Sequence, residues 1–175
     1  VPPLAFIPAA ERFNLMSSID SWVVRKAFET ISTNKDIVAG WQFSINLSGQ
    51  SLCEDNFLKF VVDAFDRTGA APEQICFEIT ETAAVANLMR ASRFISVLKG
   101  MGCRFSLDDF GTGLSSFGYL RTLEVNYLKI DGSFVRDILG NPVNRAVVEA
   151  ANQIGHAMGM QTIAEFVENE EILKV

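Results

Sequence analysis

Histidine is nearly absent from this sequence. The chain of 175 residues holds one histidine, His156, within a helical stretch. A single imidazole excludes a metal site built from several histidines, and we interpret His156 as a packed or surface side chain. Cysteine is also scarce, since Cys53, Cys76 and Cys103 are odd in number and form no CxxC pair. We therefore expect free thiols in apolar surroundings and a reducing compartment, with neither a zinc site nor a disulfide scaffold.

Long hydrophobic runs and an excess of basic charge are missing as well. No uninterrupted apolar run approaches the roughly 18 residues of a membrane span, so we expect no direct membrane insertion. The 21 acidic and 15 basic residues give a formal net charge of −6, which argues against a nucleic-acid polymer as partner. The chain is, however, 49% hydrophobic with a mean hydropathy of +0.20. This content predicts a substantial core, and the length favours one domain.

Apolar segments of strand length alternate with segments of helical periodicity. The expected strands are residues 43–47, 75–80, 104–108, 125–131 and 161–164. The expected helices are residues 9–13, 18–31, 82–98 and 115–123, one that follows a capping box at Ser51 and Glu54 and ends at Gly69, one from Asn141-Pro142, and one near Asn169. Such alternation predicts parallel βαβ units with right-handed crossovers.

Polar side chains mark the carboxyl ends of the expected strands. They are Asn46, Glu78, Asp108, Asp131 and Glu165. In parallel units these ends lie on one face, where a βα barrel has its active site and an open sheet has its switch point. Because side chains alternate along a strand, Ser106 shares a side with Asp108, and Lys129 shares a side with Asp131. We therefore predict a polar functional mouth on this face.

Two adjacent aspartates stand at the centre of this pattern. Asp108 and Asp109 end an apolar strand and precede glycines at positions 111 and 113. Two neighbouring carboxylates are costly unless a cation or a basic group neutralises them, and glycines let the backbone approach a ligand closely. Carboxylates with one amide oxygen favour Mg²⁺ or Mn²⁺, with Ca²⁺ as an inhibitory competitor.

Lys129 is open to three interpretations at this stage. Two ions at Asp108 and Asp109 could clamp the attacking and leaving oxygens of a phosphodiester, and Lys129 would then orient the attacking water or help to deprotonate it. Alternatively, Lys129 and Asp131 form a structural ion pair inside a barrel. A Schiff-base lysine of the aldolase type is the third interpretation, which the surrounding carboxylates oppose by keeping the amine protonated.

Six motifs, in order along the entire chain, resemble those of the EAL domain, the bacterial cyclic di-GMP phosphodiesterase module. They are Phe6-Ile-Pro-Ala-Ala-Glu11, Ser44-Ile-Asn-Leu-Ser48, Phe77-Glu-Ile-Thr-Glu81, Asp108-Asp-Phe-Gly-Thr-Gly113, Tyr127-Leu-Lys-Ile-Asp131 and Thr162-Ile-Ala-Glu165. The resemblance implies an α/β fold, a modified (β/α)8 TIM-like barrel. It also implies hydrolysis of cyclic di-GMP to linear pGpG with two Mg²⁺ or Mn²⁺ ions.

The resemblance assigns roles residue by residue. Ligands of the first metal are Asn46, Glu78 and Asp108, and the groups around the second metal and its water are Asp108, Asp109, Asp131 and Glu165. Catalytic roles fall to Lys129, which holds the water, Glu165, which supports its activation, and Glu81, which braces the loop after Asp109. Contacts to the substrate fall to Glu168, Asn46 and Asp131.

The resemblance also predicts partners and location. The loop at residues 110–116 is linked in this family to dimerisation and to coupling with sensor modules. We therefore expect a homodimer through this loop and fusion to sensor or GGDEF-type modules. The expected location is the cytoplasm, including the cytoplasmic part of a membrane-anchored sensor.

Two departures from the family pattern are visible. Phe166 stands where glycine is frequent, and its ring is expected to narrow the pocket. The Glu-Ala-Leu tripeptide is absent from the sequence, so we expect this first-metal ligand upstream of Val1 and a glutamine-glycine segment downstream of Val175. A barrel of this type has about 250 residues. Residues 1–175 are then one EAL-type barrel domain, incomplete at both ends.

Three functional hypotheses follow from these features. The parent protein is a phosphodiesterase, because every catalytic position visible in the sequence is filled. Alternatively, it is a catalytically inactive EAL module that serves as a cyclic di-GMP receptor or a protein-interaction domain. In the third hypothesis the fragment itself is inert, since an open barrel exposes apolar edges and lacks a metal ligand. For these 175 residues alone we expect weak turnover or none.

Overall fold

Five parallel strands form one sheet in the computed structural model, which describes residues 1–113 and 117–175. The strands are β1 (Phe43–Leu47), β2 (Ile75–Thr80), β3 (Arg104–Phe110), β4 (Tyr127–Ile130) and β5 (Gln161–Ala164). Their order across the sheet equals their order along the chain. Each crossover therefore adds the next strand at the same edge, as in a βα barrel, whereas a doubly wound sheet reverses direction. The predicted α/β class with barrel-like winding is confirmed.

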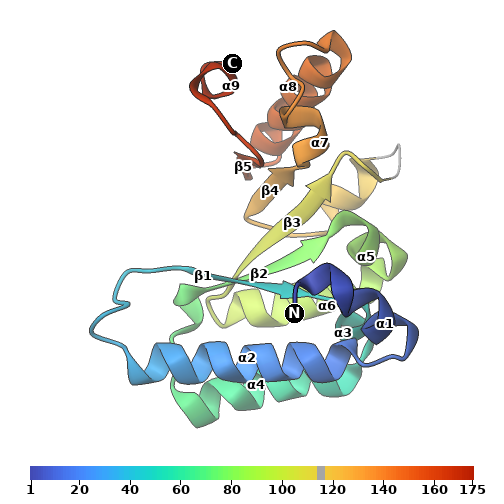
Figure 1. Cartoon of the computed structure of the whole chain (residues 1–175). Helices are drawn as coiled ribbons and strands as arrows, with labels where there is room; N and C mark the ends of the chain where they lie inside the picture. The colour runs from blue at the N-terminus through green and yellow to red at the C-terminus, as the bar shows by residue number, and fades with distance from the viewer. Residues whose placement is uncertain (114–116) are drawn as a thin grey trace.

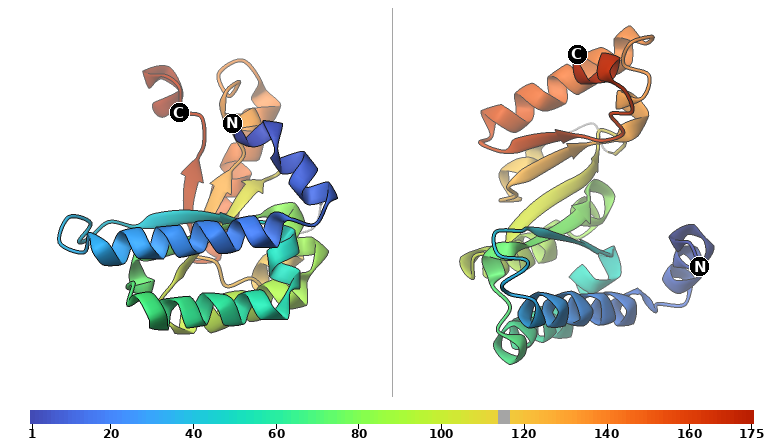
Figure 2. Two further views of the ribbon diagram at one scale, coloured as in Figure 1. Left: turned by 60° about the horizontal axis from the view of Figure 1, so that its bottom comes forward. Right: turned by 60° about the vertical axis from the view of Figure 1, so that its left-hand side comes forward.

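Helices connect the strands and pack against the sheet (Figure 1). The α-helices are α1 (Ile7–Arg12), α2 (Met16–Thr33), α3 (Gly49–Cys53), α4 (Asp55–Thr68), α5 (Glu81–Ala86), α6 (Leu88–Gly100), α7 (Gly132–Val135), α8 (Pro142–Ala157) and α9 (Glu170–Leu173), and the 3-10 helices are η1 (Pro3–Ala5), η2 (Pro72–Gln74) and η3 (Phe117–Arg121). Helices α2 and α4 lie side by side at the β1 end of the sheet, and α8 packs on β4 and β5 (Figure 2). In the described part of the chain, no helix has both the length and the apolar character needed to cross a membrane.

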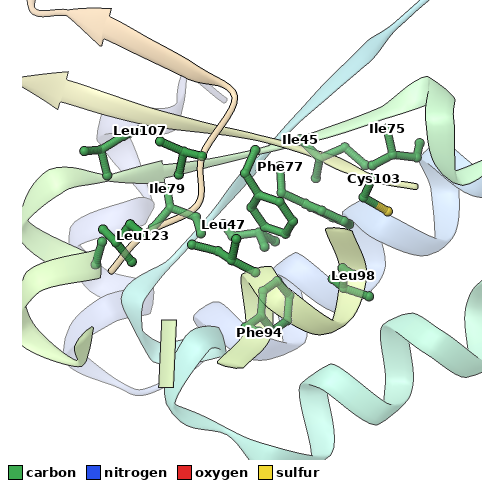
Figure 3. Packing of buried hydrophobic residues seen from close by; sticks show 14 of the residues in the cluster. Ile45, Leu47, Ile75, Phe77, Ile79, Phe94, Leu98, Cys103, Leu107 and Leu123 are labelled. Atoms are coloured by element: carbon green, nitrogen blue, oxygen red, sulfur yellow. The ribbon is translucent and has the colours of Figure 1, made fainter. Parts of the chain in front are cut away.

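Alternation along the strands gives the sheet an apolar face and a polar face. Phe77 and Ile79 on β2 are buried, whereas Glu78 between them is only half-buried. On the apolar face, Phe77 packs edge-on against Phe94 of α6, with ring centroids 6.1 Å apart, and Leu98 lies in the same cluster (Figure 3). The helices thus bury one side of β1, β2, β3 and β4, whereas no residue of β5 is fully buried. The other side of the sheet carries the polar residues of the predicted site.

The predicted capping box at Ser51 and Glu54 is wrong. Ser51 lies inside α3, and the cap of that helix is Ser48, whose hydroxyl oxygen accepts the backbone N–H of Ser51. The Ser51 hydroxyl instead donates to Asp20 at 2.6 Å. The Ser51 side chain, which the local spacing predicted to cap a helix, therefore binds Asp20 on α2. The chain forms two helices here, α3 and α4, where one was expected.

The helix predicted over residues 82–98 is interrupted. Thr80 caps α5 through its side chain, α5 ends at Ala86, and α6 begins at Leu88 after the single residue Asn87. Asn87 has φ −138° and ψ 50°, which is not helical. Asparagine favours such local irregularity because its side chain competes for backbone hydrogen bonds. A helix was also predicted over residues 115–123. Within this range the structure has a short 3-10 helix at residues 117–121.

Asp20 ties helix α2 to the loop that follows β1. It is 4% exposed, and its Oδ2 atom accepts hydrogen bonds from the backbone N–H of Ser48 and the hydroxyl of Ser51. Removing the carboxylate leaves two donors in a poorly hydrated place. We expect Asp20→Ala to lower the free energy of unfolding by about 2 kcal/mol in urea titrations. The exposed Asp36 provides the control, and an equal loss in Asp36→Ala would contradict this account.

Candidate active site

Lys129 on β4 lies at the centre of a carboxylate cluster at the carboxyl ends of the strands. Its Nζ atom is 3.0 Å from Glu78 Oε2, 2.9 Å from Asp108 Oδ1 and 2.8 Å from Glu165 Oε1. These carboxylates come from β2, from β3 and from the residue after β5. Between 12% and 22% of each of the four side chains is exposed. The structure thus brings together four of the predicted site residues, from four different segments of the chain.

The strand register explains which side chains face this centre. Glu78 is the Cα partner of Asn46 on β1 and of Ser106 on β3. Asn46 is exposed beside Glu78. Ser106 is 1% exposed, and its Oγ atom has no hydrogen-bond partner within the described residues. The ion pairs that Lys129 forms with described residues do not include Asp131, so the structural pair considered as an alternative is not formed.

The environment of Lys129 keeps its amine charged. Burial by itself lowers the pKa of a lysine, but the hydrogen bonds to Glu165, Asp108 and Glu78 outweigh burial and raise the pKa of Lys129 above its usual value. A protonated amine neither attacks a carbonyl nor accepts a proton from water. The Schiff-base interpretation and a role as general base are therefore disfavoured, and what Lys129 offers is a fixed positive charge with N–H donors.

A β-bulge places both adjacent aspartates near the centre. Leu107 pairs with Leu128 and Phe110 with Ile130, so β3 has one residue more than β4 over this interval. Asp109 adopts a left-handed conformation with φ +57°, which is uncommon for a residue other than glycine. In a regular strand Asp108 and Asp109 would point to opposite faces. The bulge removes that constraint, and simple alternation along the sequence did not predict it.

Three carboxylates form a cluster that fits a cation. One oxygen each from Asp108, Asp109 and Glu165 lies within 4.8 Å of the other two. Burial, followed by repulsion from Asp108, Asp131 and Glu165, raises the pKa of Asp109, which shows that negative charge at this position is unfavourable in the protein alone. A hard divalent ion would relieve this repulsion, and carboxylate oxygens are the donors that Mg²⁺ and Mn²⁺ favour.

Two other predicted site residues have different partners. Asp131 caps α7, because its Oδ1 atom accepts the backbone N–H of Ser133 at 2.8 Å and also the Ser133 hydroxyl. Glu168 is exposed, and its Oε1 atom is 3.6 Å from Nε of Arg136. Both lie in segments that leave the carboxyl ends of β4 and β5. Neither residue is among the ion-pair partners that Lys129 has in the described part of the chain.

Glu81 connects the end of β2 to the loop after Asp109. It is 1% exposed. Its Oε2 atom accepts the N–H of Gly111 at 3.0 Å, and its Oε1 atom accepts the hydroxyl of Tyr119 at 2.5 Å. Burial and the Glu81 carboxylate raise the pKa of Tyr119, so this phenol stays a donor. Residues 114–116 of the predicted dimerisation loop lie outside the described part.

Phe166 packs on the backbone that follows Asp131. It has φ +52° and is 52% exposed. A Cβ atom added to Gly132 would lie 2.0 Å from the Phe166 ring, so the ring rests directly on this glycine. The guanidinium carbon of Arg136 lies over the same ring, 3.8 Å from the ring centroid. The bulky side chain at the position where glycine was expected therefore joins α7 to the segment after β5.

The contact of Phe166 with Gly132 can be tested by a double-mutant cycle. We expect Gly132→Ala to lower the free energy of unfolding by about 2 kcal/mol, because the added methyl group overpacks against the ring. In the background Phe166→Gly the same change should cost less than half of this, because the ring is gone. Gly100→Ala is the control, since nothing lies within 4 Å of its added Cβ. Equal costs of Gly132→Ala in both backgrounds would disprove the contact.

Two cavities lie at opposite ends of the strands. One, of about 700 Å³, is lined by Asn46 and Glu78 among other residues and opens at the carboxyl ends. Another, of about 940 Å³, is lined by Arg104, Tyr127 and Gln161 at the amino ends. The larger cavity contains none of the carboxylates around Lys129. We therefore assign the chemistry to the carboxyl ends, where the titratable groups converge.

Sequence reasoning missed two residues that contact predicted site residues, Tyr119 and Arg136, and one property of a third, Ser106. Tyr119 and Arg136 come from η3 and from the end of α7, and neither carries a spacing signal that points to Glu81 or Glu168. Ser106 was placed on the correct side of β3, but its unpartnered hydroxyl could not be foreseen. Only the three-dimensional arrangement shows these contacts.

Comparison with known proteins relates this geometry to a family. A family model described as EAL domain matches residues 1–175. Cyclic di-GMP phosphodiesterase PdeB of Shewanella oneidensis is 43% identical over 171 residues, covering 98% of this chain and 20% of the relative. Cyclic di-GMP phosphodiesterase PdeF of Escherichia coli K12 is 36% identical over 172 residues, covering 98% and 23%. The chain thus spans about a fifth to a quarter of these relatives.

Comparison of the fold with solved structures also relates the chain to EAL domains. The solved structure titled PaMucR phosphodiesterase, c-di-GMP complex, superposes with a TM-score of 0.92 at 30% identity, covering 99% of this chain and 71% of that one. The family model spans all 175 residues, and the barrel-like order of the strands agrees with it. The chain therefore belongs to the EAL domain family.

Proposed function

We propose that the protein containing this chain hydrolyses cyclic di-GMP to linear pGpG in bacterial second-messenger signalling, in a reaction that depends on Mg²⁺ or Mn²⁺. The observation that carries the proposal is the contact of one lysine ammonium with three carboxylates from three segments of the chain. One of these carboxylates, Asp108, has Asp109 next to it at the β-bulge. Relatives at 43% and 36% identity are named as phosphodiesterases of this dinucleotide. The proposal extends that activity to this chain.

The proposed ligands follow the family pattern and the oxygen cluster. A first ion would be held by Asn46, Glu78 and Asp108, and a second by Asp108, Asp109, Asp131 and Glu165. The oxygen cluster of Asp108, Asp109 and Glu165 supports the second set. Such ions, when bound, polarise the phosphodiester and lower the pKa of a coordinated water. The Asp131 carboxylate also caps α7, which fixes its direction.

The residues of the chain then divide the work of hydrolysis. Lys129 orients the attacking water by donating one N–H to it in place of one of its three carboxylate contacts, and its other N–H groups keep the remaining carboxylates in place. Glu165 accepts a proton as the water oxygen bonds to phosphorus. The bond from phosphorus to one 3′ oxygen breaks, and this oxygen leaves as a hydroxyl after taking up a proton from solvent. The product is the linear dinucleotide with a 5′ phosphate. Glu81 keeps the loop after Asp109 in position.

A product assay tests the proposal. The full-length protein, incubated with cyclic di-GMP and Mn²⁺, should yield pGpG as resolved by chromatography. EDTA should abolish the product, and Ca²⁺ added to the manganese reaction should inhibit it. Tight binding of cyclic di-GMP without any product in Mn²⁺ or Mg²⁺ would contradict the proposal and favour the receptor hypothesis.

Further features of the proposal rest on the family resemblance. We propose a homodimer through residues 110–116, fusion to sensor or GGDEF-type modules, a cytoplasmic location, and a single barrel domain to which residues 1–175 contribute. The formal net charge of −6 supports a small ligand rather than a nucleic-acid polymer. Light scattering of the full-length protein would measure the oligomeric state.

A further inference from the structure

The cavity at the amino ends of β3, β4 and β5 is separate from the carboxylates around Lys129. The first residue of each of these three strands lines it, namely Arg104, Tyr127 and Gln161. Each stands an even number of residues before a site residue on or directly after its own strand, so the cavity and the proposed site share the polar face of the sheet. None of the roles assigned above uses this cavity.

Basic side chains outnumber acidic ones in the wall of this cavity. The charged residues that line it are Lys99, Arg104, Arg121 and Glu124. Arg104 donates to the neutral hydroxyl of Tyr127 at 2.8 Å, and the ion pairs among described residues include neither Arg104 nor Arg121. Nζ of Lys99 is 2.7 Å from the carbonyl oxygen of Glu124 but 3.9 Å from its carboxylate. The wall therefore concentrates positive charge in a chain whose formal net charge is −6.

The helix ends beside the cavity do not occupy these cations. Carbonyl groups at the carboxyl end of a helix carry partial negative charge and attract basic side chains. At the end of α8, however, the last carbonyls accept the N–H groups of Met158, Gly159 and Met160, and at the end of α6 they accept those of Met101 and Gly102. The guanidinium groups in the cavity wall therefore keep N–H donors for an anionic ligand.

The rest of the wall fits the organic part of a nucleotide. Leu120 and Leu123 contribute apolar surface from one segment, and Met158 contributes it from the end of α8. Oδ1 of Asn126 accepts the N–H of Phe105 at 3.0 Å, so the amide nitrogen of Asn126 can donate to a ligand. The volume of about 940 Å³ lies within the range of about 300 to 1,000 Å³ found for small-molecule sites.

We propose that this amino-end cavity binds a nucleoside triphosphate, whose phosphate chain contacts Arg104, Arg121 and Lys99. The two arginines bind phosphate oxygens through paired N–H groups, and the lysine binds as a point charge. The base and ribose occupy the apolar part of the cavity. Binding needs no divalent ion, because the positive charge comes from the protein. This inference goes beyond the proposed function and does not depend on it.

Calorimetry of the full-length protein with ATP in EDTA tests this site. The affinity should fall about 10-fold or more in Arg104→Met and in Arg121→Met, because each change removes charge-assisted hydrogen bonds. Arg145→Met is the matched control, since Arg145 pairs with Glu149 on α8 at 55% and 59% exposure, and its affinity should stay within about 2-fold of the wild type. Inorganic triphosphate should bind about 10-fold more weakly than ATP, because it has no base to bury against the apolar wall.

A second pair of variants tests the cavity without changing its charge. Ala157 lines the cavity at the end of α8, so the indole in Ala157→Trp should fill part of the space and weaken ATP binding. Ala150→Trp is the control, because Ala150 is exposed on the same helix and is not among the described residues that line the cavity. Absence of ATP binding in the wild type, or equal affinities in cavity and control variants, would overturn the proposal. Inorganic triphosphate that binds as tightly as ATP would overturn the assignment to a nucleoside.

The outcomes are distinguishable from those for the proposed function, because ATP binding is measured in EDTA and pGpG formation in Mn²⁺. Binding of ATP that depends on Arg104 and Arg121, in a protein that forms no pGpG, would support this cavity and contradict the phosphodiesterase. Formation of pGpG by a protein that does not bind ATP would contradict the cavity and support the phosphodiesterase.

Discussion

Replacing Lys129 by methionine is expected to slow hydrolysis of cyclic di-GMP by about 100- to 1000-fold. Methionine has an unbranched apolar side chain that is shorter than lysine by the terminal nitrogen, so the change removes the ammonium that contacts Glu78, Asp108 and Glu165. Loss of one preorganised donor at a reacting centre has an effect of this size. The rate should fall mainly in kcat, because the proposed role of Lys129 is to hold the water. Initial rates of pGpG formation in saturating Mn²⁺ measure the effect.

The same substitution should also destabilise the protein when metal is absent. In EDTA, Lys129→Met leaves three largely buried carboxylates without their cation, and we expect a loss of about 3 kcal/mol in the free energy of unfolding. Lys26 is the matched control, because it pairs with Glu29 at 2.9 Å but at 56% and 45% exposure. Lys26→Met should change stability by less than about 1 kcal/mol. Equal losses in both variants would show that burial does not strengthen the Lys129 contacts.

The strands could be predicted from sequence because alternation and flanking breakers agree there with the final packing. Residues 43–47, 75–80 and 161–164 were predicted with the bounds that the structure shows. The start of a helix at Asn141-Pro142 also agrees: α8 begins at Pro142, and the Asn141 side chain caps it by accepting the N–H groups of Val143 and Asn144. Local chemistry decides these features. The capture of Ser51 by Asp20 depends on a partner 31 residues away, which local patterns do not reveal. The break at Asn87 is a single non-helical residue, which the apolar periodicity across it conceals.

The candidate site divides in the same way. Motifs at strand ends predicted that Glu78, Asp108, Lys129 and Glu165 would face a common centre, because parallel strands bring their carboxyl ends together. The left-handed Asp109 could not be predicted, because strict alternation sends its side chain to the other face. The stack of Arg136 on Phe166 was equally hidden, since it joins segments about thirty residues apart. Both features depend on the backbone conformation of loop residues, which sets the direction of the side chain and which the sequence pattern does not predict.

Asp108→Asn should abolish both turnover and the stabilisation that Mn²⁺ provides. Asp108 is shared by the Lys129 contact and the oxygen cluster with Asp109 and Glu165. Asparagine keeps the shape, but it replaces an anionic oxygen by an amide and weakens metal binding. We expect kcat for cyclic di-GMP to fall at least about 1000-fold, because a metal-dependent reaction loses its cofactor.

The thermal readout separates metal binding from folding. In the wild type, Mn²⁺ at about 100 times its Kd adds about 2.7 kcal/mol to the free energy of unfolding and raises Tm accordingly. Asp108→Asn will be less stable than the wild type in EDTA, because Lys129 loses a partner, so only the increment on adding Mn²⁺ is diagnostic. That increment should vanish in Asp108→Asn and persist in the control Asp66→Asn, whose carboxylate is exposed on α4. If Mn²⁺ stabilised Asp108→Asn as much as it stabilises the wild type, Asp108 would be excluded as a ligand. Loss of a ligand weakens metal binding, and weaker binding gives a smaller gain in the free energy of unfolding.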